Sequence, residues 1–202
     1  RSSDLGQDHV VTALTRALSE KRLHHAYLFT GTRGVGKTTI SRIFAKALNC
    51  QGDDGNGDIT AHPCGVCPAC RAIDEGRYPD YIEMDAASNR SVEDITALLD
   101  KAMYAPTQGR FKIYMIDEVH MLSATAFNAM LKTLEEPPEY IKFILATTDP
   151  QKVPITVLSR CLQFNLRNMT PSGIVSHMEN ILAQEKIKYE EPALRLLANG
   201  AR

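Results

Sequence analysis

A glycine-rich stretch at residues 31–38 constrains the fold of this chain more than any other feature. It matches the pattern G-x-x-x-x-G-K-[ST]. An apolar segment at residues 26–29 precedes it, and a segment with helical spacing of apolar residues, 37–49, follows it. A strand that turns through glycines into a helix is the setting in which this pattern forms a phosphate-binding loop. We therefore expect a P-loop, and a chance glycine loop before a helix is the weaker alternative.

Two side chains at the end of this stretch suit a nucleoside triphosphate with its metal. The Lys37 ammonium supplies a point charge for the outer phosphates, and the Thr38 hydroxyl can ligate Mg²⁺. The helix that follows directs its positive N-terminus to the same place. We expect ATP to be held here by Gly31, Thr32, Arg33, Gly34, Val35, Gly36, Lys37 and Thr38.

Apolar strand-like segments alternate with helical ones along most of the chain. The strand-like segments are residues 26–29, 81–84, 111–116, 141–146 and 161–164. This alternation predicts an α/β fold with a parallel, doubly wound sheet. Beyond residue 167 the pattern is wholly helical, around residues 171–186 and 190–200. We expect a nucleotide-binding domain over residues 1–166 and a small, incomplete helical domain over residues 167–202.

Two acids, Asp117 and Glu118, end the apolar segment 111–116 and supply the second half of such a site. Asp117 at the carboxyl end of a strand can hold Mg²⁺ through water. Glu118 is placed to polarise the attacking water as a general base. A solvated strand end is the alternative, and the P-loop argues against it.

Two threonines, Thr147 and Thr148, close the next apolar segment. A hydroxyl there can orient the attacking water near the terminal phosphate. We favour Thr148 for this role. Thr147 is the competing candidate, and a plain capping role before Asp149 and Pro150 is a further alternative.

Four cysteines form a group within a region that lacks periodicity. Three of them follow the spacing C-x₂-C-x₂-C, and the fourth precedes them across a Gly/Asp-rich stretch at residues 52–58. Tetrahedral Zn²⁺ needs four sulfur or nitrogen ligands, and four thiolates close its coordination sphere. We therefore expect a structural zinc module over residues 50–70, held by Cys50, Cys64, Cys67 and Cys70.

Two residues bear on this ligand set. His62 is the competitor of Cys50 for the fourth position. Cys161 belongs to a different predicted strand, so we expect it to be a buried thiol outside the metal site.

Composition sets limits on partners and location. The 23 Lys and Arg residues nearly cancel the 24 Asp and Glu residues, so the whole chain has no field that attracts nucleic acid. Any contact with DNA would depend on local groups such as backbone N–H at helix N-termini. No apolar run approaches the roughly 18 residues of a membrane span, and no signal-peptide pattern is present. We expect no membrane partner and a cytoplasmic location.

Several stretches resemble the gamma/tau subunit of bacterial DNA polymerase III, a clamp-loader ATPase of the AAA+ class. They are residues 24–29, 31–38, 117–122, 131–138, 146–152 and 158–161. The match runs over nearly the whole chain and includes the four-cysteine insert, which few families share.

This resemblance implies more than the residues alone. It implies an AAA+ parallel sheet flanked by helices, with a zinc-binding insert and a helical lid. Arg160, in the Ser-Arg-Cys stretch, would act as an arginine finger on ATP held by a neighbouring subunit. The implied partners are other clamp-loader subunits, a sliding clamp and primer–template DNA, within a DNA polymerase holoenzyme. The alternatives are a nucleotide-sensing scaffold with little hydrolysis of its own and another AAA+ DNA motor.

Overall fold

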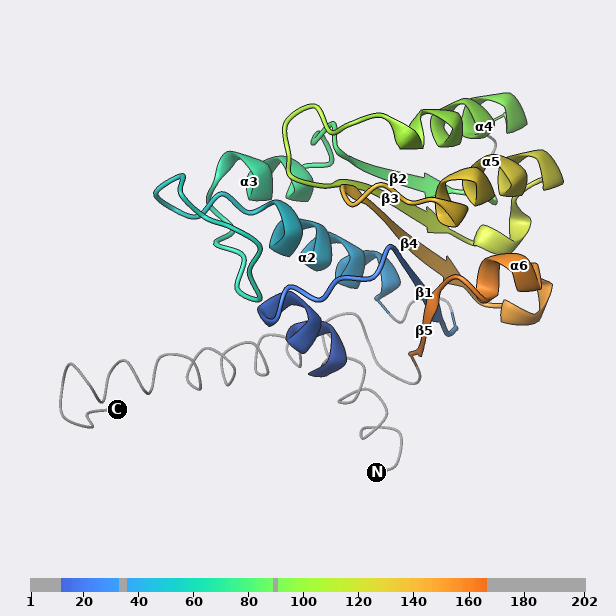
Figure 1. The fold of residues 1–202 in the computed structure, drawn as a ribbon, viewed down its shortest axis with the longest axis horizontal. Helices are drawn as coiled ribbons and strands as arrows, with labels where there is room; N and C mark the ends of the chain where they lie inside the picture. Colours follow the sequence, from blue (N-terminus) through green and yellow to red (C-terminus); the bar gives the residue numbers. More distant parts are fainter. Residues whose placement is uncertain (1–11, 33–35, 89–90, 167–202) are drawn as a thin grey trace.

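A five-stranded sheet forms the centre of the molecule (Figure 1). The computed structural model describes residues 12–32, 36–88 and 91–166. The sheet has the order β2-β3-β4-β1-β5, and every strand pair is parallel. The predicted parallel α/β architecture is therefore confirmed. The strands are β1 (Ala26–Thr30), β2 (Tyr81–Asp85), β3 (Lys112–Asp117), β4 (Ile141–Thr147) and β5 (Leu162–Asn165).

The strand register brings the carboxyl ends of the strands to one edge of the sheet. Thr30 of β1 pairs with Thr147 of β4, and Asp85 of β2 pairs with Asp117 of β3. In open parallel sheets, ligands bind at this edge, where the chain order changes between neighbouring strands. Here the change occurs at β1, which lies between β4 and β5.

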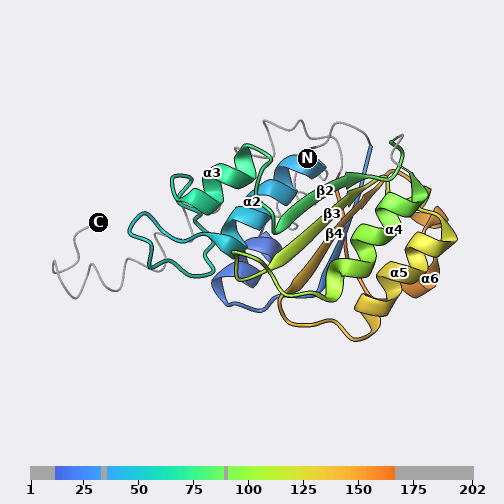
Figure 2. The same ribbon diagram turned by 90° about the horizontal axis from the view of Figure 1, so that it is seen from above.

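Helices cover both faces of the sheet (Figure 2). The helical residues 12–19, α2 (Lys37–Asn49) and α3 (Pro68–Asp74) contribute to one core, while α4 (Val92–Asp100), α5 (Ala124–Glu135) and α6 (Ile155–Leu158) contribute to the other. Three 3₁₀ turns complete the elements. They are η1 (Lys101–Met103), η2 (Val119–Met121) and η3 (Pro150–Lys152).

Local sequence explains why α2 and α5 form where they do. Ile40, Phe44 and Leu48 recur every four residues along α2, and all are almost fully buried. The Ser123 hydroxyl accepts a hydrogen bond from the Ala126 N–H at 3.1 Å and caps the start of α5. Helix α5 ends at Glu135, just before Pro137 and Pro138, because proline cannot continue a helix.

The expected elements agree with the observed ones to within a few residues. The helix expected at residues 37–49 has those bounds, whereas the last strand begins at Leu162, one residue later than expected. Helices α3 and α6 were not expected from the sequence pattern. The helices expected at residues 171–186 and 190–200 lie outside the described residues. Within the described ranges, no helix has the length and apolar content to cross a membrane.

Candidate nucleotide site and metal centre

The glycine-rich loop joins the carboxyl end of β1 to the start of α2. Gly31 donates its backbone N–H to the Thr147 carbonyl at 3.3 Å, so the loop begins against β4. Thr32 is exposed, and Thr38 is half-buried in the first turn of α2. Gly36 precedes α2 with φ 86° and ψ 23°, a left-handed conformation that glycine adopts without strain. Arg33, Gly34 and Val35 lie outside the described residues.

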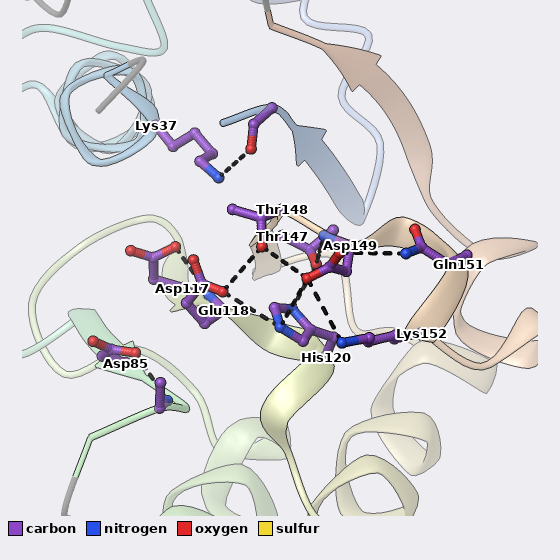
Figure 3. Close-up of polar contacts among 12 residues, drawn as sticks. Lys37, Asp85, Asp117, Glu118, His120, Thr147, Thr148, Asp149, Gln151 and Lys152 are labelled. Atoms are coloured by element: carbon purple, nitrogen blue, oxygen red, sulfur yellow. Dashed lines mark hydrogen bonds and ion pairs between the residues drawn. The ribbon is translucent and has the colours of Figure 1, made fainter. Parts of the chain in front are cut away.

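The Lys37 side chain folds back over this loop. Only 6% of the residue is exposed, and its ammonium donates to the Gly31 carbonyl at 3.1 Å. In Figure 3 the side chain reaches from α2 toward the side on which Asp117, Glu118 and Thr148 gather. A buried cation that bonds a backbone carbonyl is ready to exchange that weak partner for a phosphate oxygen.

Asp117 lies at the end of β3 and faces the same space. Burial raises the pKa of Asp117, while the hydrogen bond from the Glu118 N–H and the positive charge of Lys37 act in the opposite direction. The electrostatic contact with Lys37 places the ammonium and the carboxylate on one side of the molecule. Asp85, paired with Asp117 in the sheet, adds a further negative charge that raises the same pKa.

Glu118 has an unusual backbone that sets the direction of its side chain. Its φ of 52° and ψ of 45° lie in the left-handed region, which few residues other than glycine adopt. Such backbone strain is concentrated at functional sites. The residue is 7% exposed, and its Oε2 atom lies 3.4 Å from the Thr148 hydroxyl and 3.4 Å from His120 Nε2.

The two threonines at the end of β4 have different surroundings. Thr147 is fully buried, and its hydroxyl contacts His120 Nδ1 at 2.7 Å and accepts the Asp149 N–H at 3.0 Å. The Thr148 hydroxyl instead lies beside the carboxylates of Glu118 and Asp149. Only Thr148 therefore presents its hydroxyl toward Glu118, which favours it over Thr147 as the group beside a terminal phosphate.

His120 and Asp149 belong to this polar network, although the sequence analysis gave them no role (Figure 3). His120 Nε2 lies 3.6 Å from Asp149 Oδ2, and Lys152 Nζ lies 3.9 Å from the same oxygen. The Thr148 hydroxyl donates to Asp149, which is the largest of the effects that lower the pKa of this carboxyl. A polar His120 between the apolar residues Val119 and Met121 was the available sequence signal.

The four predicted zinc ligands come together at the other end of α2, where Cys50 follows the last helical residue. Their Sγ atoms all lie within 4.8 Å of one another. Zn–S bonds of about 2.3 Å in a tetrahedron require sulfurs about 3.8 Å apart, so a small contraction closes the site. His62 is not a member of this cluster among the described residues, which favours Cys50 as the fourth ligand. The cluster consists of Cys50, Cys64, Cys67 and Cys70.

Backbone N–H groups point at these sulfurs, as they do around thiolates. Cys50 Sγ accepts from Gly52 and Cys64, each at 3.3 Å. Cys67 Sγ accepts from Gln51 and from Cys70, and the latter bond caps the start of α3. Such donors stabilise negative sulfur, and the donor set is therefore compatible with zinc.

The thiols differ in acidity. Burial opposes ionisation of Cys67, but the backbone donors of Gln51 and Cys70 lower its pKa to about 7. Burial raises the pKa of Cys70 well above its ordinary value and also raises that of Cys50. A bound cation would be needed to hold all these sulfurs as thiolates together.

The Arg160 guanidinium lies away from Lys37. Arg160 precedes β5, and β5 is parallel to β1, so it lies near the amino end of β1, whereas Lys37 follows the carboxyl end. Its charge contributes to the lowered pKa of His25, a shift caused mainly by burial. Cys161 is a free thiol outside the four-cysteine cluster, and burial raises its pKa to about 12.

Comparisons with known proteins agree on one family. A family model described as "DNA polymerase III, delta subunit" matches residues 6–170, and one described as "DNA polymerase III clamp loader subunit, ATPase lid domain" matches residues 173–202. The chain is 59% identical over 197 residues to "DNA polymerase III subunit tau/gamma" of Haemophilus influenzae and 60% identical to "DNA polymerase III subunit tau" of Escherichia coli.

These matches cover 98% of this chain, but only 28% and 30% of those two relatives. Among solved structures, a DNA polymerase III gamma subunit-related protein from Thermotoga maritima aligns with a TM-score of 0.55 at 22% identity. The alignment covers 77% of this chain and 45% of that one. At this identity the structural match supports the fold alone.

Proposed function

Because this chain belongs to the DNA polymerase III clamp-loader family, we propose that it is an ATP-binding and ATP-hydrolysing motor that loads a sliding clamp onto primed DNA. One observation carries this proposal. The ammonium of Lys37, the carboxylates of Asp117 and Glu118, and the hydroxyl of Thr148 come from separate elements and meet at the carboxyl edge of the sheet.

Each group has a part in phosphoryl transfer to water. Lys37 and the loop amides neutralise the phosphate oxygens. Glu118 accepts the proton of the attacking water as a general base, since its carboxylate lies next to this space. The Thr148 hydroxyl orients that water or the terminal phosphate. Gly31, Thr32, Arg33, Gly34, Val35 and Gly36 would line the phosphates with their backbone.

Thr38 and Asp117 would hold Mg²⁺, the former directly and the latter through water. When bound, the ion neutralises charge that develops on the phosphate oxygens. The fit is supported by the setting of Asp117, a half-buried carboxylate whose pKa is raised by burial and further by the negative charges of Glu118 and Asp85.

Arg160 would complete the site of a neighbouring subunit as an arginine finger. Its position near the amino end of β1 keeps it from the phosphates of its own chain. The test mixes two variants in the full chain with its partner subunits. Lys37→Ala binds ATP weakly but keeps the finger, and Arg160→Ala binds ATP but lacks the finger.

We expect the mixture to hydrolyse ATP faster than the sum of the two variants alone. In the mixture, ATP bound to an Arg160→Ala chain can meet the arginine of a neighbouring Lys37→Ala chain. A matched control is Arg22→Ala, which removes an exposed arginine whose guanidinium lies 3.8 Å from the Glu20 carboxylate. A mixture that equals the sum would contradict action between subunits.

A nucleotide-sensing scaffold is the second candidate. The structure of Glu118 argues against it, because a scaffold has no use for a strained, buried carboxylate beside the phosphate space. The discriminating measurement is the ATPase rate of the assembled loader with and without clamp and primed DNA. Stimulation supports the motor, and tight ATP binding without stimulation supports the scaffold.

Three further assignments accompany this proposal. Zinc would be held by the four clustered cysteines as a structural ion. The nucleotide-binding domain would cover residues 1–166 and the lid residues 167–202. The clamp, primer–template DNA and other loader subunits would be the partners, in the cytoplasm.

A further inference from the structure

His120 lies in η2, the turn that begins directly after the proposed general base Glu118. Only 6% of the His120 side chain is exposed to solvent. Both ring nitrogens have specific neighbours. Nδ1 lies 2.7 Å from the Thr147 hydroxyl, and Nε2 faces Oε2 of Glu118 at 3.4 Å and Oδ2 of Asp149 at 3.6 Å. The ring therefore connects the end of β4 to the residue that begins the turn after β3.

The hydrogen-bond pattern defines which nitrogen carries hydrogen. The Thr147 hydroxyl oxygen accepts the Asp149 N–H at 3.0 Å, so its single hydrogen is free to point at His120 Nδ1. Nε2 faces carboxylate oxygens, which only accept. In the neutral ring, the arrangement assigns the acceptor role to Nδ1 and the donor role to Nε2.

Of the two carboxylates near Nε2, that of Glu118 is the nearer, at 3.4 Å against 3.6 Å for Asp149. Asp149 is also contacted by the Thr148 hydroxyl at 3.1 Å, by Gln151 at 3.3 Å and by Lys152. Thr148 has one hydrogen, and its contact with Asp149 is shorter than its 3.4 Å contact with Glu118. The Nε2–H hydrogen is thus available to Glu118.

We infer that His120 is a positioning residue that holds the Glu118 carboxylate through Nε2–H and ties its orientation to the Thr147–Asp149 turn. The inference rests on the proposed function, because Glu118 must act as the general base. The 3.4 Å separation is longer than a closed hydrogen bond, and catalytic contacts are often long until substrate binds. Closure on ATP would fix the carboxylate against the attacking water.

Two isosteric variants separate this role from a purely structural one. In His120→Gln the amide nitrogen occupies the position of Nε2 and keeps a donor for Glu118. In His120→Asn the amide occupies the position of Nδ1, so the contact with Thr147 is kept and the donor to Glu118 is lost. Both variants are made in the full chain, with single-turnover hydrolysis and the Kd for ATP as readouts. Gln151→Ala, an exposed contact of Asp149, is the control.

We expect His120→Asn to lower the hydrolysis rate by about 10-fold or more, the value of one hydrogen bond to a charged group. His120→Gln should stay within about 3-fold of the native rate. The Kd for ATP should be unchanged in both. If His120 acts through Glu118, His120→Asn should cause no further loss once Glu118 is replaced by Gln.

Three results would overturn the inference alone. They are native rates in His120→Asn, a lower rate in His120→Gln than in His120→Asn, and a full additional loss in the Glu118→Gln background. A native chain that binds ATP and hydrolyses none, alone or in the assembled loader, would overturn the proposed function and this inference with it.

Discussion

The cysteine cluster and the phosphate site lie at opposite ends of α2 and differ in the partners of their polar atoms. In the cluster, backbone N–H groups point at sulfurs, and no large side-chain movement is needed to close the site. At the phosphate site, side chains contact one another, and Lys37 bonds a carbonyl that a phosphate would replace. The first arrangement is compatible with a permanent ion and the second with an exchangeable ligand.

Removal of zinc should have the largest effect and would show whether the cluster is a folding element. We expect chelation or Cys67→Ser to abolish zinc binding and unfold the insert, because structural zinc contributes about 10–16 kcal/mol in small modules. Metal analysis and thermal unfolding are the measurements.

Cys161→Ser is the matched control, since Cys161 lies outside the cluster. It should retain one zinc per chain. If the native protein is purified without metal and its insert at residues 50–70 is nevertheless folded, the cysteine cluster is not a zinc-dependent folding element.

Loss of the ammonium at the phosphate site should come next in size. Lys37→Ala should weaken ATP binding by about 100-fold, because charge-assisted hydrogen bonds are worth about 1.5–3 kcal/mol. The fold should remain intact, since Lys37 serves the ligand. The same change at Lys46, also on α2 and paired with Asp74 at 2.9 Å, is the control. Undiminished binding of ATP by Lys37→Ala would refute the phosphate assignment.

The smallest expected effect concerns the stability cost of a half-buried acid, Asp117. Burial raises the pKa of Asp117, so its ionisation opposes folding as the pH rises from the unfolded pKa to the folded one. At pH 7, without Mg²⁺ or nucleotide, Asp117→Asn should therefore raise the Tm, by less than the loss expected from removal of zinc. The gain should vanish in acid, where the native carboxyl is protonated.

Asp53→Asn, a change at an exposed carboxylate of the insert, is the control and should leave the Tm nearly unchanged. A lower Tm in Asp117→Asn at pH 7 would mean that the ionised carboxylate stabilises the native structure. The phosphate site would then resemble the cysteine cluster in being optimised for stability.

Sequence patterns located the parts of both regions whose position follows from local rules. Lys37 has a fixed place in its motif, and Asp117 and Glu118 end an apolar run, so a parallel sheet brings them to one edge. The C-x₂-C spacing likewise favours a turn that presents two thiols to the same site. The ligand and catalytic roles of these residues stay predictions.

The remaining parts depend on geometry that periodicity does not encode. The N-cap of helix α3 is Cys67, whose sulfur accepts the capping hydrogen bond in place of an oxygen. Helix α6 has only four residues, so neither helix has a recognisable sequence pattern. His120 reaches Thr147 because Glu118 adopts a left-handed backbone and a 3₁₀ turn follows. Such a contact between distant segments has no signature in sequence.

The proposed action of Arg160 on ATP held by a neighbouring subunit, together with its separation from Lys37 along β1 and β5, would restrict how copies of this fold can associate. A two-fold dimer joins one patch to itself, and a single patch would have to include both ends of these strands. Head-to-tail stacking would bring Arg160 of one subunit near Lys37 of the next, since the amino edge of one sheet then faces the carboxyl edge of the neighbouring sheet. Repetition of that contact would generate either a closed ring or an open spiral. In an open spiral, the last subunit at one end would have a nucleotide site with no neighbour to complete it.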